Sequence, residues 1–506
     1  MKRLVLLTLI LFSFTVVNAQ QLKFKIAGVP DTTIHLVKYV GKKLFYADTA
    51  EIKRGVVSFN GSKQSPGILA ILMPDQKYFE FIHNNEDVHI ETKAPDFIGN
   101  MTIKKSKENQ VFYNYIRQLK QNQEESNILV AQRDALPESD TEKREALTRQ
   151  IKALGDRVVG YQKSMVAENQ GLLVAKIINM SIEIDIPEPE DPTDSTFKYR
   201  YFRDHFFDHV DFNDDRLVNT PVIQRKLDYF LSPQMLIQHP DTLIKYVGNV
   251  VDRTPKGTNM YKFFVSQATS YFEKSKIMGM DKAAVVFIDR YFCQKDEDEN
   301  YLAFWMDAEK LDDLCKDNKV RLRLVQGEVP PNLILTDTTS KNWIDFHSLE
   351  NDYVILYFWD PNCGHCKKEI PKLGKLYDEK LKDRNVEVFA VGKATGDDFK
   401  AWKKIIREKK LSFINVGVTK EIYDIAKKDP YELIPSKTTL ASLNYQETYD
   451  IYSTPRVWIL DKDKKIIGKN LGISQLEDYL DKIQGFEDAP KLFPVEEKEA
   501  TKTPSN

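Results

Sequence analysis

The sequence predicts a multidomain protein with an N-terminal antiparallel β module, a central α-helical region and a C-terminal α/β domain. Three observations predict this organisation. Apolar and polar residues alternate with a period of two up to about Thr102, a helical apolar stripe follows, and two continuous apolar runs later flank a further helical stretch. At 506 residues, the chain also exceeds what one hydrophobic core usually supports.

Residues 1–19 are predicted to be a secretory signal peptide that is cut after Ala19. Met1-Lys2-Arg3 provides the positive start, residues 4–17 form an apolar run, and Val17 and Ala19 occupy the small-residue positions of the cleavage site. The alternative is an uncleaved membrane anchor, but the run is short for a spanning helix. No later segment is long and apolar enough to span a membrane. We therefore expect an exported, periplasmic protein.

Residues 20–102 are predicted to form the β module. Short polar breaks rich in Gly, Pro, Asp and Asn separate its alternating runs, which is typical of an antiparallel sandwich or barrel-like fold. The clearest alternating runs are Leu22–Ile26, Thr33–Val37, Val56–Phe59 and Tyr78–Ile82. We find no catalytic cluster among these residues.

Residues 103–327 are predicted to be helical. One apolar stripe has alternating steps of four and three residues, which indicates one face of a helix packed against neighbouring helices. Its members are Leu147, Ile151, Leu154, Val158, Tyr161 and Met165. Ser139 or Asp140 is expected to cap this helix, and the Pro- and acid-rich stretch from Ile186 to Ser195 is expected to be a loop.

Two residue pairs in the helical region could carry chemistry. Cys293 and Cys315 can form a disulfide between helices or remain two buried free thiols. His205 and His209 are separated by one turn of a predicted helix, a spacing that can bind a metal ion. Because aromatic residues lie between the histidines, packing and surface roles are favoured over a metal site.

Residues 328–485 are predicted to form the α/β domain. The apolar runs from Asp352 to Phe358 and from Val386 to Val391 flank a helical stretch from Cys363 to about Lys382. Continuous apolar strands joined by a helix indicate a parallel pair that is buried on both faces.

A β-hairpin and a closing helix are expected at the end of this domain. The predicted segments are the strands Arg456–Leu460 and Lys465–Gly468, their turn Asp461–Lys464 and the helix Ser474–Gln484. The remaining residues, 486–506, are rich in Pro, Glu, Lys and Thr and are predicted to be disordered.

Cys363-Gly364-His365-Cys366 is the motif with the clearest chemistry. Cys363 falls where an apolar strand ends and a helix begins, so the free N–H groups and partial positive charge of the helix start favour its thiolate. Cys366 lies one turn further and can resolve a mixed disulfide formed on Cys363. His365 can tune the potential through a hydrogen bond or a positive charge. A zinc site is the alternative, but Cys293 and Cys315 do not supply a second ligand pair at suitable spacing.

The segment from Phe358 to Pro371 resembles the active-site segment of exported thioredoxin-like proteins of the TlpA/ResA group. Trp359 matches the tryptophan before the cysteines, and Glu369 and Pro371 match the extension that follows them. The resemblance implies a thioredoxin-like fold for residues 328–485 and a redox-active Cys363–Cys366 disulfide. It also implies that Glu369 assists proton transfer at the dithiol.

Thr454-Pro455 is a second feature of this resemblance, which implies a cis-proline opposite the dithiol and a groove that binds the substrate backbone. Two departures stand out. Tyr357 replaces the buried aspartate of thioredoxins proper, and residues 413–452 are long for the fold. An inserted helix near Lys420–Asp429 is expected in that stretch, where it could shape the choice of partner.

These observations predict an exported thiol-disulfide oxidoreductase that exchanges disulfides with protein substrates and with a redox partner protein. No dissociable cofactor and no metal are expected. A net charge of −2 gives no sign of nucleic-acid binding. The large N-terminal half could serve substrate capture or homo-oligomer formation.

Three other classes of protein are alternatives to a reductase. The TlpA/ResA resemblance favours a reductase, whereas a C-G-H-C dithiol resembles that of disulfide isomerases and favours a more oxidising protein. A non-enzymatic protein that uses the domain as a scaffold is a further alternative, which the intact cysteines disfavour. A peroxiredoxin is disfavoured because the Pro and Thr that should precede its cysteine are missing before Cys363.

Overall fold

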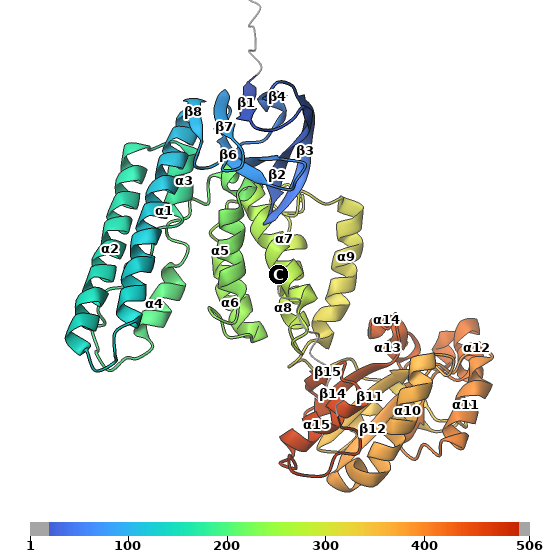
Figure 1. The fold of residues 1–506 in the computed structure, drawn as a ribbon. Coiled ribbons are helices and arrows are strands. Elements are labelled where there is room, and N and C mark those ends of the chain that lie inside the picture. Colours follow the sequence, from blue (N-terminus) through green and yellow to red (C-terminus); the bar gives the residue numbers. More distant parts are fainter. Residues whose placement is uncertain (1–19, 495–506) are drawn as a thin grey trace, which may run out of the picture. The chain divides into compact units, whose positions relative to one another are not determined.

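The computed structural model describes residues 20–494, so the predicted signal peptide lies outside the described residues, as does the segment 495–506. The chain forms two compact units. The first contains the described residues up to Leu236 together with Val250–Phe264, and the second contains Ile237–Asn249 together with the described residues from Val265 onward. Figure 1 shows the elements of both units along the chain. Within residues 20–494, no helix is both long enough and apolar enough to cross a membrane.

Two four-stranded sheets form the N-terminal β module. Their strands are β1 (Gln21–Ala27), β2 (Thr32–Val40), β3 (Lys43–Ile52), β4 (Val56–Asn60), β5 (Gly67–Leu72), β6 (Tyr78–His83), β7 (Val88–Lys93) and β8 (Thr102–Lys105). The strand orders are β4-β1-β7-β8 and β3-β2-β5-β6. Phe24 of β1 packs against Phe59 of its own sheet and against Phe79 and Phe81 of the other, so the core lies between the two sheets.

The antiparallel prediction for this module is confirmed for every strand pair except one. β1 and β7 pair in parallel, with Leu22 opposite Val88. The physical reason is the route of the chain. After β4 the chain crosses to the second sheet for β5 and β6, and it then re-enters the first sheet as β7 on the other edge of β1, in the same direction as β1.

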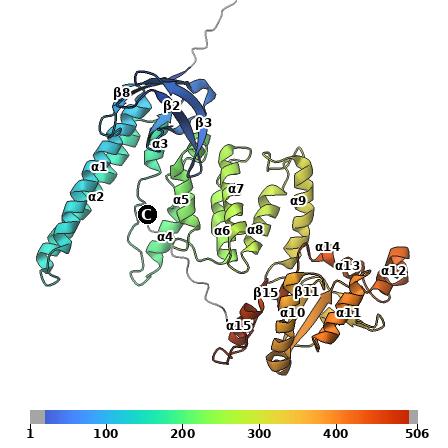
Figure 2. The ribbon, with the colours of Figure 1, turned by 45° about the vertical axis from the view of Figure 1, so that its right-hand side comes forward.

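Helices form the rest of the first unit and continue into the second. They are α1 (Lys107–Asp134), α2 (Thr141–Glu168), α3 (Leu173–Asn179), α4 (Phe197–His205), α5 (Pro221–Leu231), α6 (Pro240–Val251), α7 (Asn259–Lys274), α8 (Asp281–Phe287) and α9 (Ala308–Arg321). The long helices α1 and α2 lie side by side in Figures 1 and 2. The predicted stripe lies on α2, where Leu154 and Met165 are buried, and Asp140 precedes the helix as expected.

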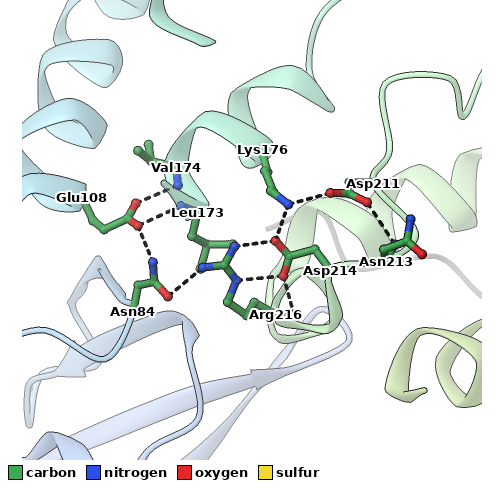
Figure 3. A network of polar contacts seen from close by, with 9 residues as sticks. All are labelled: Asn84, Glu108, Leu173, Val174, Lys176, Asp211, Asn213, Asp214 and Arg216. Atoms are coloured by element: carbon green, nitrogen blue, oxygen red, sulfur yellow. Dashed lines mark hydrogen bonds and ion pairs between the residues drawn. The ribbon is translucent and has the colours of Figure 1, made fainter. Parts of the chain in front are cut away.

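A buried polar network joins the β module to the helices of the first unit (Figure 3). Glu108 of α1 is 1% exposed, and its carboxylate accepts hydrogen bonds from the backbone N–H groups of Leu173 and Val174, both at 2.8 Å. These two groups begin α3, so Glu108 satisfies N–H groups that a helix start leaves unpaired. Asn84, which follows β6, donates to Glu108 at 2.6 Å and accepts from Arg216 at 2.9 Å.

We expect Glu108→Ala to destabilise the first unit by about 3 kcal/mol, because it leaves two buried backbone donors and the partly buried amide of Asn84 without their acceptor. Hydrogen exchange of the α3 amides, followed by mass spectrometry on the full chain, should show faster exchange at this helix. Glu124→Ala, on the exposed part of the same helix, is the matched control and should change stability by less than ~0.5 kcal/mol. Equal exchange in the two variants would contradict the assigned role of Glu108.

Cys293 and Cys315 form a disulfide, which decides between the two alternatives left open by the sequence. The two Cα atoms are 5.6 Å apart. Cys293 follows a π-helical turn at Ile288–Phe292, and Cys315 lies on α9. The bond therefore ties α9 to the segment that follows α8.

The C-terminal part of the second unit contains a five-stranded sheet in the order β13-β12-β11-β14-β15 and a two-stranded sheet. The strands are β9 (Ile334–Thr336), β10 (Trp343–Asp345), β11 (Tyr353–Trp359), β12 (Val386–Gly392), β13 (Ile414–Val416), β14 (Arg456–Asp461) and β15 (Ile466–Lys469). The predicted parallel pair is β11 and β12, and the predicted hairpin is β14 and β15. The three-part architecture expected from the sequence, with a β module, a helical region and a C-terminal α/β domain, is confirmed.

Helices cover both faces of the five-stranded sheet. They are α10 (Gly364–Leu376), α11 (Asp398–Glu408), α12 (Lys420–Lys428), α13 (Leu440–Leu443), α14 (Tyr445–Thr448) and α15 (Ile473–Ile483). Ile355 and Tyr357 of β11 face a core built with α10, α11 and α15, whereas Leu356 and Phe358 face a core built with α12 and α14. The predicted insertion helix is α12, and its segment covers the second face of the sheet.

The predicted disorder of residues 486–506 is wrong for the part that the structure describes. Leu492 and Phe493 pack against the domain core, and their backbone N–H groups donate to Glu477 of α15 at 2.8 and 2.9 Å. Lys491 forms an ion pair with Asp481 at 2.8 Å. The composition of the tail is polar overall, but a short apolar pair and one basic residue find partners on α15. These contacts depend on tertiary structure rather than on composition.

Candidate active site

The dithiol lies where β11 ends and α10 begins. Cys363 is the N-cap residue of α10, and the backbone N–H of Cys366 donates to the Cys363 sulfur at 3.4 Å. The Cys363 thiol donates to the carbonyl oxygen of Thr454 at 3.3 Å. Both cysteines are free thiols, with Cys363 partly exposed and Cys366 fully buried. The accessible thiol is therefore the one that the helix start supports.

The surroundings move the two thiol pKa values in opposite directions. Partial burial raises the pKa of Cys363, but hydrogen bonds from Cys366, Thr454 and the His365 backbone outweigh burial and lower it overall. Burial raises the pKa of the Cys366 thiol to about 11, and the neighbouring Cys363 sulfur adds to this rise. Cys363 is therefore the more readily ionised thiol of the pair, whereas the buried thiol of Cys366 stays protonated at neutral pH.

We expect iodoacetamide to alkylate Cys363 of the reduced chain with a pH midpoint below ~8.5, the value of an unperturbed thiol. A lowered pKa increases the thiolate fraction at pH 7, so modification at neutral pH should be faster than for a free cysteine. Mass spectrometry of the modified peptide measures both sites, and Cys366 should stay unmodified near pH 7. The urea-unfolded chain is the control, in which both midpoints should return to about 8.5. Equal labelling of the two cysteines in the folded chain would contradict the assignment.

A pocket of about 330 Å³, which we call the Glu369 pocket, has Thr454 in its wall. Its walls include Tyr357 of β11, His365 and Glu369 of α10, the segment Ser453–Arg456, and residues 470–473 before α15. The side chain of Glu369 is 14% exposed and forms an ion pair with Lys372 at 2.9 Å. The pocket therefore brings a carboxylate, an imidazole and a phenol together beside the cis-proline segment.

A smaller pocket of about 140 Å³, which we call the Asp360 pocket, also has Thr454 in its wall. Trp359, Asp360, Lys393 and the exposed Tyr452 contribute to its walls. Lys393 contacts Asp360 at 3.4 Å and Asp398 at 3.1 Å. The two pockets share Ser453 and Thr454 as lining residues, and the carbonyl oxygen of Thr454 contacts the Cys363 sulfur.

The structure places the predicted site residues around Cys363 and Cys366. Trp359 is buried and ends β11, and the Thr454–Pro455 peptide bond is cis. Glu369 and Pro455 line the same pocket. Gly364 begins α10, and His365 contributes its backbone N–H near the Cys363 sulfur while its imidazole is exposed along the pocket wall.

Sequence reasoning missed several residues around the dithiol. Asp360, Lys393 and Asp398 come from three separate segments, and only the parallel pairing of β11 and β12 brings them together. Arg456 begins β14 and Asn470 directly follows β15, and Arg456 donates to Asn470 at 3.4 Å in the wall of the Glu369 pocket. The sequence pattern that could have identified Asp360 as a site residue is its position directly after an apolar strand.

The two histidines of the helical region do not share a helix face. α4 ends at His205, so His209 lies beyond the helix and the expected spacing on one helix is not formed. His205 contacts Asp208 at 2.6 Å, and His209 contacts the carbonyl oxygen of Ile182 at 3.1 Å. Among residues 20–494, no group of three or more His, Cys, Asp and Glu side chains could hold a metal ion.

Known proteins resemble this chain mainly in its C-terminal domain. The family model described as AhpC/TSA matches residues 327–468. A thiol-disulfide oxidoreductase ResA from Bacillus cereus is 30% identical over 161 residues, which cover 31% of this chain and 78% of that protein. The chain belongs to the ResA family of thiol-disulfide oxidoreductases. It is therefore an enzyme of the protein-disulfide oxidoreductase class with a thioredoxin-like fold.

Further similarities of this ResA family member cover different shares of the chain. ResA from Bacillus subtilis is 38% identical over 66 residues, which cover 13% of this chain and 36% of that protein. The structure of a domain of a possible thiol-disulfide isomerase from Cytophaga hutchinsonii is 32% identical, covers 33% of this chain and 97% of that chain, and has a TM-score of 0.26. A thioredoxin-like protein from Bacteroides caccae covers 59% of this chain and 97% of that chain, with 16% identity and a TM-score of 0.39.

The accessory regions match two families described only as domains of unknown function. DUF4369 covers residues 21–112, and DUF5106 covers residues 162–297. Neither description names an activity. The chemistry known for the ResA family therefore belongs to the C-terminal domain.

Proposed function

We propose that this protein is an exported thiol-disulfide oxidoreductase that reduces disulfides of protein substrates through Cys363 and Cys366. The observation that carries the proposal is the Cys363 thiol at the N-cap of α10, with a lowered pKa and with Cys366 one turn away. Cys363 attacks the substrate disulfide and forms a mixed disulfide. Cys366 then attacks the Cys363 sulfur, releases the reduced substrate and leaves a Cys363–Cys366 disulfide, which a redox partner protein reduces again.

The proposal includes roles for the surrounding residues, which rest on the family resemblance. Glu369 accepts the proton that Cys366 loses, and His365, Gly364 and Trp359 tune the redox potential. The substrate backbone docks along Thr454 and Pro455, between the two pockets. The Thr454 carbonyl oxygen already contacts the Cys363 sulfur and is in place to align a bound chain.

The export proposal rests on the predicted signal peptide and gains support from the Cys293–Cys315 disulfide, because such bonds persist in oxidising compartments and are rare in the cytosol. Domain limits of 20–102, 103–327 and 328–485 remain our proposal for the mature chain. We assign the two accessory regions to substrate capture or homo-oligomer formation, and sedimentation of the mature chain measures the latter.

Insulin reduction by residues 20–506, with dithiothreitol as electron source, tests the activity. The direction is tested by the equilibrium potential of the Cys363–Cys366 pair against glutathione. A potential near about −270 mV supports a reductase, whereas a value between about −180 and −120 mV would assign the protein as a disulfide isomerase or oxidase. The C-G-H-C sequence favours this second function. Absence of dithiol-dependent activity would contradict both assignments.

A further inference from the structure

Tyr357 carries a buried hydroxyl whose position is unusual. The residue lies in the middle of the central strand β11 and is 1% exposed. Among the described residues, its hydroxyl has no hydrogen-bond partner. An unsatisfied buried polar group costs about 1–3 kcal/mol, and phenylalanine would fill the same space without this cost. We therefore expect the hydroxyl to form a hydrogen bond at some step of the reaction.

The Tyr357 hydroxyl lies beside the reacting groups. Tyr357 lines the Glu369 pocket together with Glu369 and His365, and it belongs to the same buried core as Cys366. Burial raises the pKa of Tyr357, and negative charge on the two active-site sulfurs and on Glu369 raises it further. The phenol is therefore close to these groups and stays protonated, so it can donate a hydrogen bond into the pocket.

The resolving step of the proposed dithiol exchange needs a proton acceptor. Cys366 is fully buried, and burial raises the pKa of its thiol to about 11. As Cys366 attacks, its S–H bond breaks, the Cys363–Cys366 bond forms, and the bond between Cys363 and the substrate sulfur breaks. The leaving substrate thiolate carries the electron pair away. The Cys366 proton must go to a base, and Glu369 is the carboxylate in the adjoining pocket.

We propose that Tyr357 is a positioning residue for this proton transfer: its hydroxyl donates to the Glu369 carboxylate, directly or through one water, and holds it where it accepts the Cys366 proton. The inference rests on the proposed dithiol function. Lys372 forms an ion pair with Glu369 at 2.9 Å, and the Tyr357 hydroxyl would be a second donor to the same carboxylate. The remaining titratable or charged groups in the pocket wall are His365 of α10 and Arg456 of β14.

The two chemical steps can be separated with 5,5′-dithiobis(2-nitrobenzoate) and the reduced full chain. Attack by Cys363 releases one thionitrobenzoate and leaves the second on the Cys363 sulfur. Attack by Cys366 then releases the second thionitrobenzoate and forms the Cys363–Cys366 disulfide. In Tyr357→Phe, we expect an unchanged first phase and a second phase that is about tenfold slower at pH 7. This tenfold loss of rate is smaller than the loss expected when a general base is removed, because the hydroxyl only positions Glu369.

The pH profile of the second phase and two further variants provide independent tests of the proposal. The pH at which the second phase reaches half of its maximal rate should be higher in Tyr357→Phe than in the wild type. Loss of packing alone would not produce this change. Tyr353→Phe is the matched control, because it removes the same hydroxyl from the same strand at a different pocket. Both of its phases should equal those of the wild type. The double variant with Glu369→Gln should be no slower than Glu369→Gln alone if the two residues share one path.

A wild-type rate and pH profile in Tyr357→Phe would overturn the inference, and so would equal slowing of both phases. These failures differ from failure of the proposed function. If the wild-type chain released no second thionitrobenzoate, the dithiol exchange itself would be refuted. If it released both while Tyr357→Phe matched it, only the positioning role would be lost.

Discussion

Cys363→Ser is expected to abolish insulin reduction, lowering turnover at least ~10³-fold, because a serine hydroxyl is neither ionised near pH 7 nor able to form a disulfide. The fold should survive the change. Cys363 is the N-cap residue of α10, and serine is among the preferred N-cap residues. Insulin turbidity with dithiothreitol, corrected for the uncatalysed rate, measures the effect.

Circular dichroism and thermal unfolding of the Cys363→Ser chain serve as controls for its structure. A folded variant without activity separates loss of the nucleophile from loss of the protein. Residual activity above a tenth of the wild-type rate would contradict the assignment of Cys363. Such a result would assign the activity to another thiol. Among the described residues, Cys366 is the only other free thiol, because Cys293 and Cys315 form a disulfide.

Cys366→Ser is expected to give the second largest effect, a stable mixed disulfide between Cys363 and the substrate. The partly exposed Cys363 thiol can still attack, but the buried thiol that should displace the substrate is gone. Turnover should fall ~100-fold or more, while adducts accumulate to near the amount of enzyme. Non-reducing electrophoresis and mass spectrometry measure the adduct, and dithiothreitol should release it.

The double variant Cys363→Ser/Cys366→Ser is the control for trapping and should form no adduct. Adducts in this double variant would show that another group reacts. Substrates trapped from a cell extract by the single variant would also identify the proteins that this enzyme acts on. An absence of adducts with Cys366→Ser would contradict the order of the two attacks.

The local features of the active site could be predicted from sequence. The apolar run before Cys363 predicted β11, and the motif predicted the start of α10, because both patterns depend on residues close together in the chain. The hairpin of β14 and β15 and the closing helix α15 were predicted for the same reason. Glu369 and Thr454-Pro455 were found through the family resemblance rather than through spacing.

Features that depend on distant segments could not be predicted in this way. The parallel pairing of β1 with β7 follows from the route of the chain through another sheet. Leu492 and Phe493 were assigned to a disordered tail because their neighbours are polar, and Glu477 supplies partners that composition does not reveal. The Cys293–Cys315 disulfide required the approach of α9 to the segment that follows α8.

The sequence by itself determined the class of chemistry, because a dithiol at a helix start needs only a strand, four consecutive residues and a helix. Only the tertiary structure decided what surrounds the dithiol. Packing of β11 and β14 with α10 places Tyr357, Glu369 and Pro455 around one pocket, and burial separates the pKa values of Cys363 and Cys366. The spacing of the two cysteines along the chain identifies the sulfur atoms that we propose to react. Their protonation depends on solvent exclusion and on groups that only folding brings near.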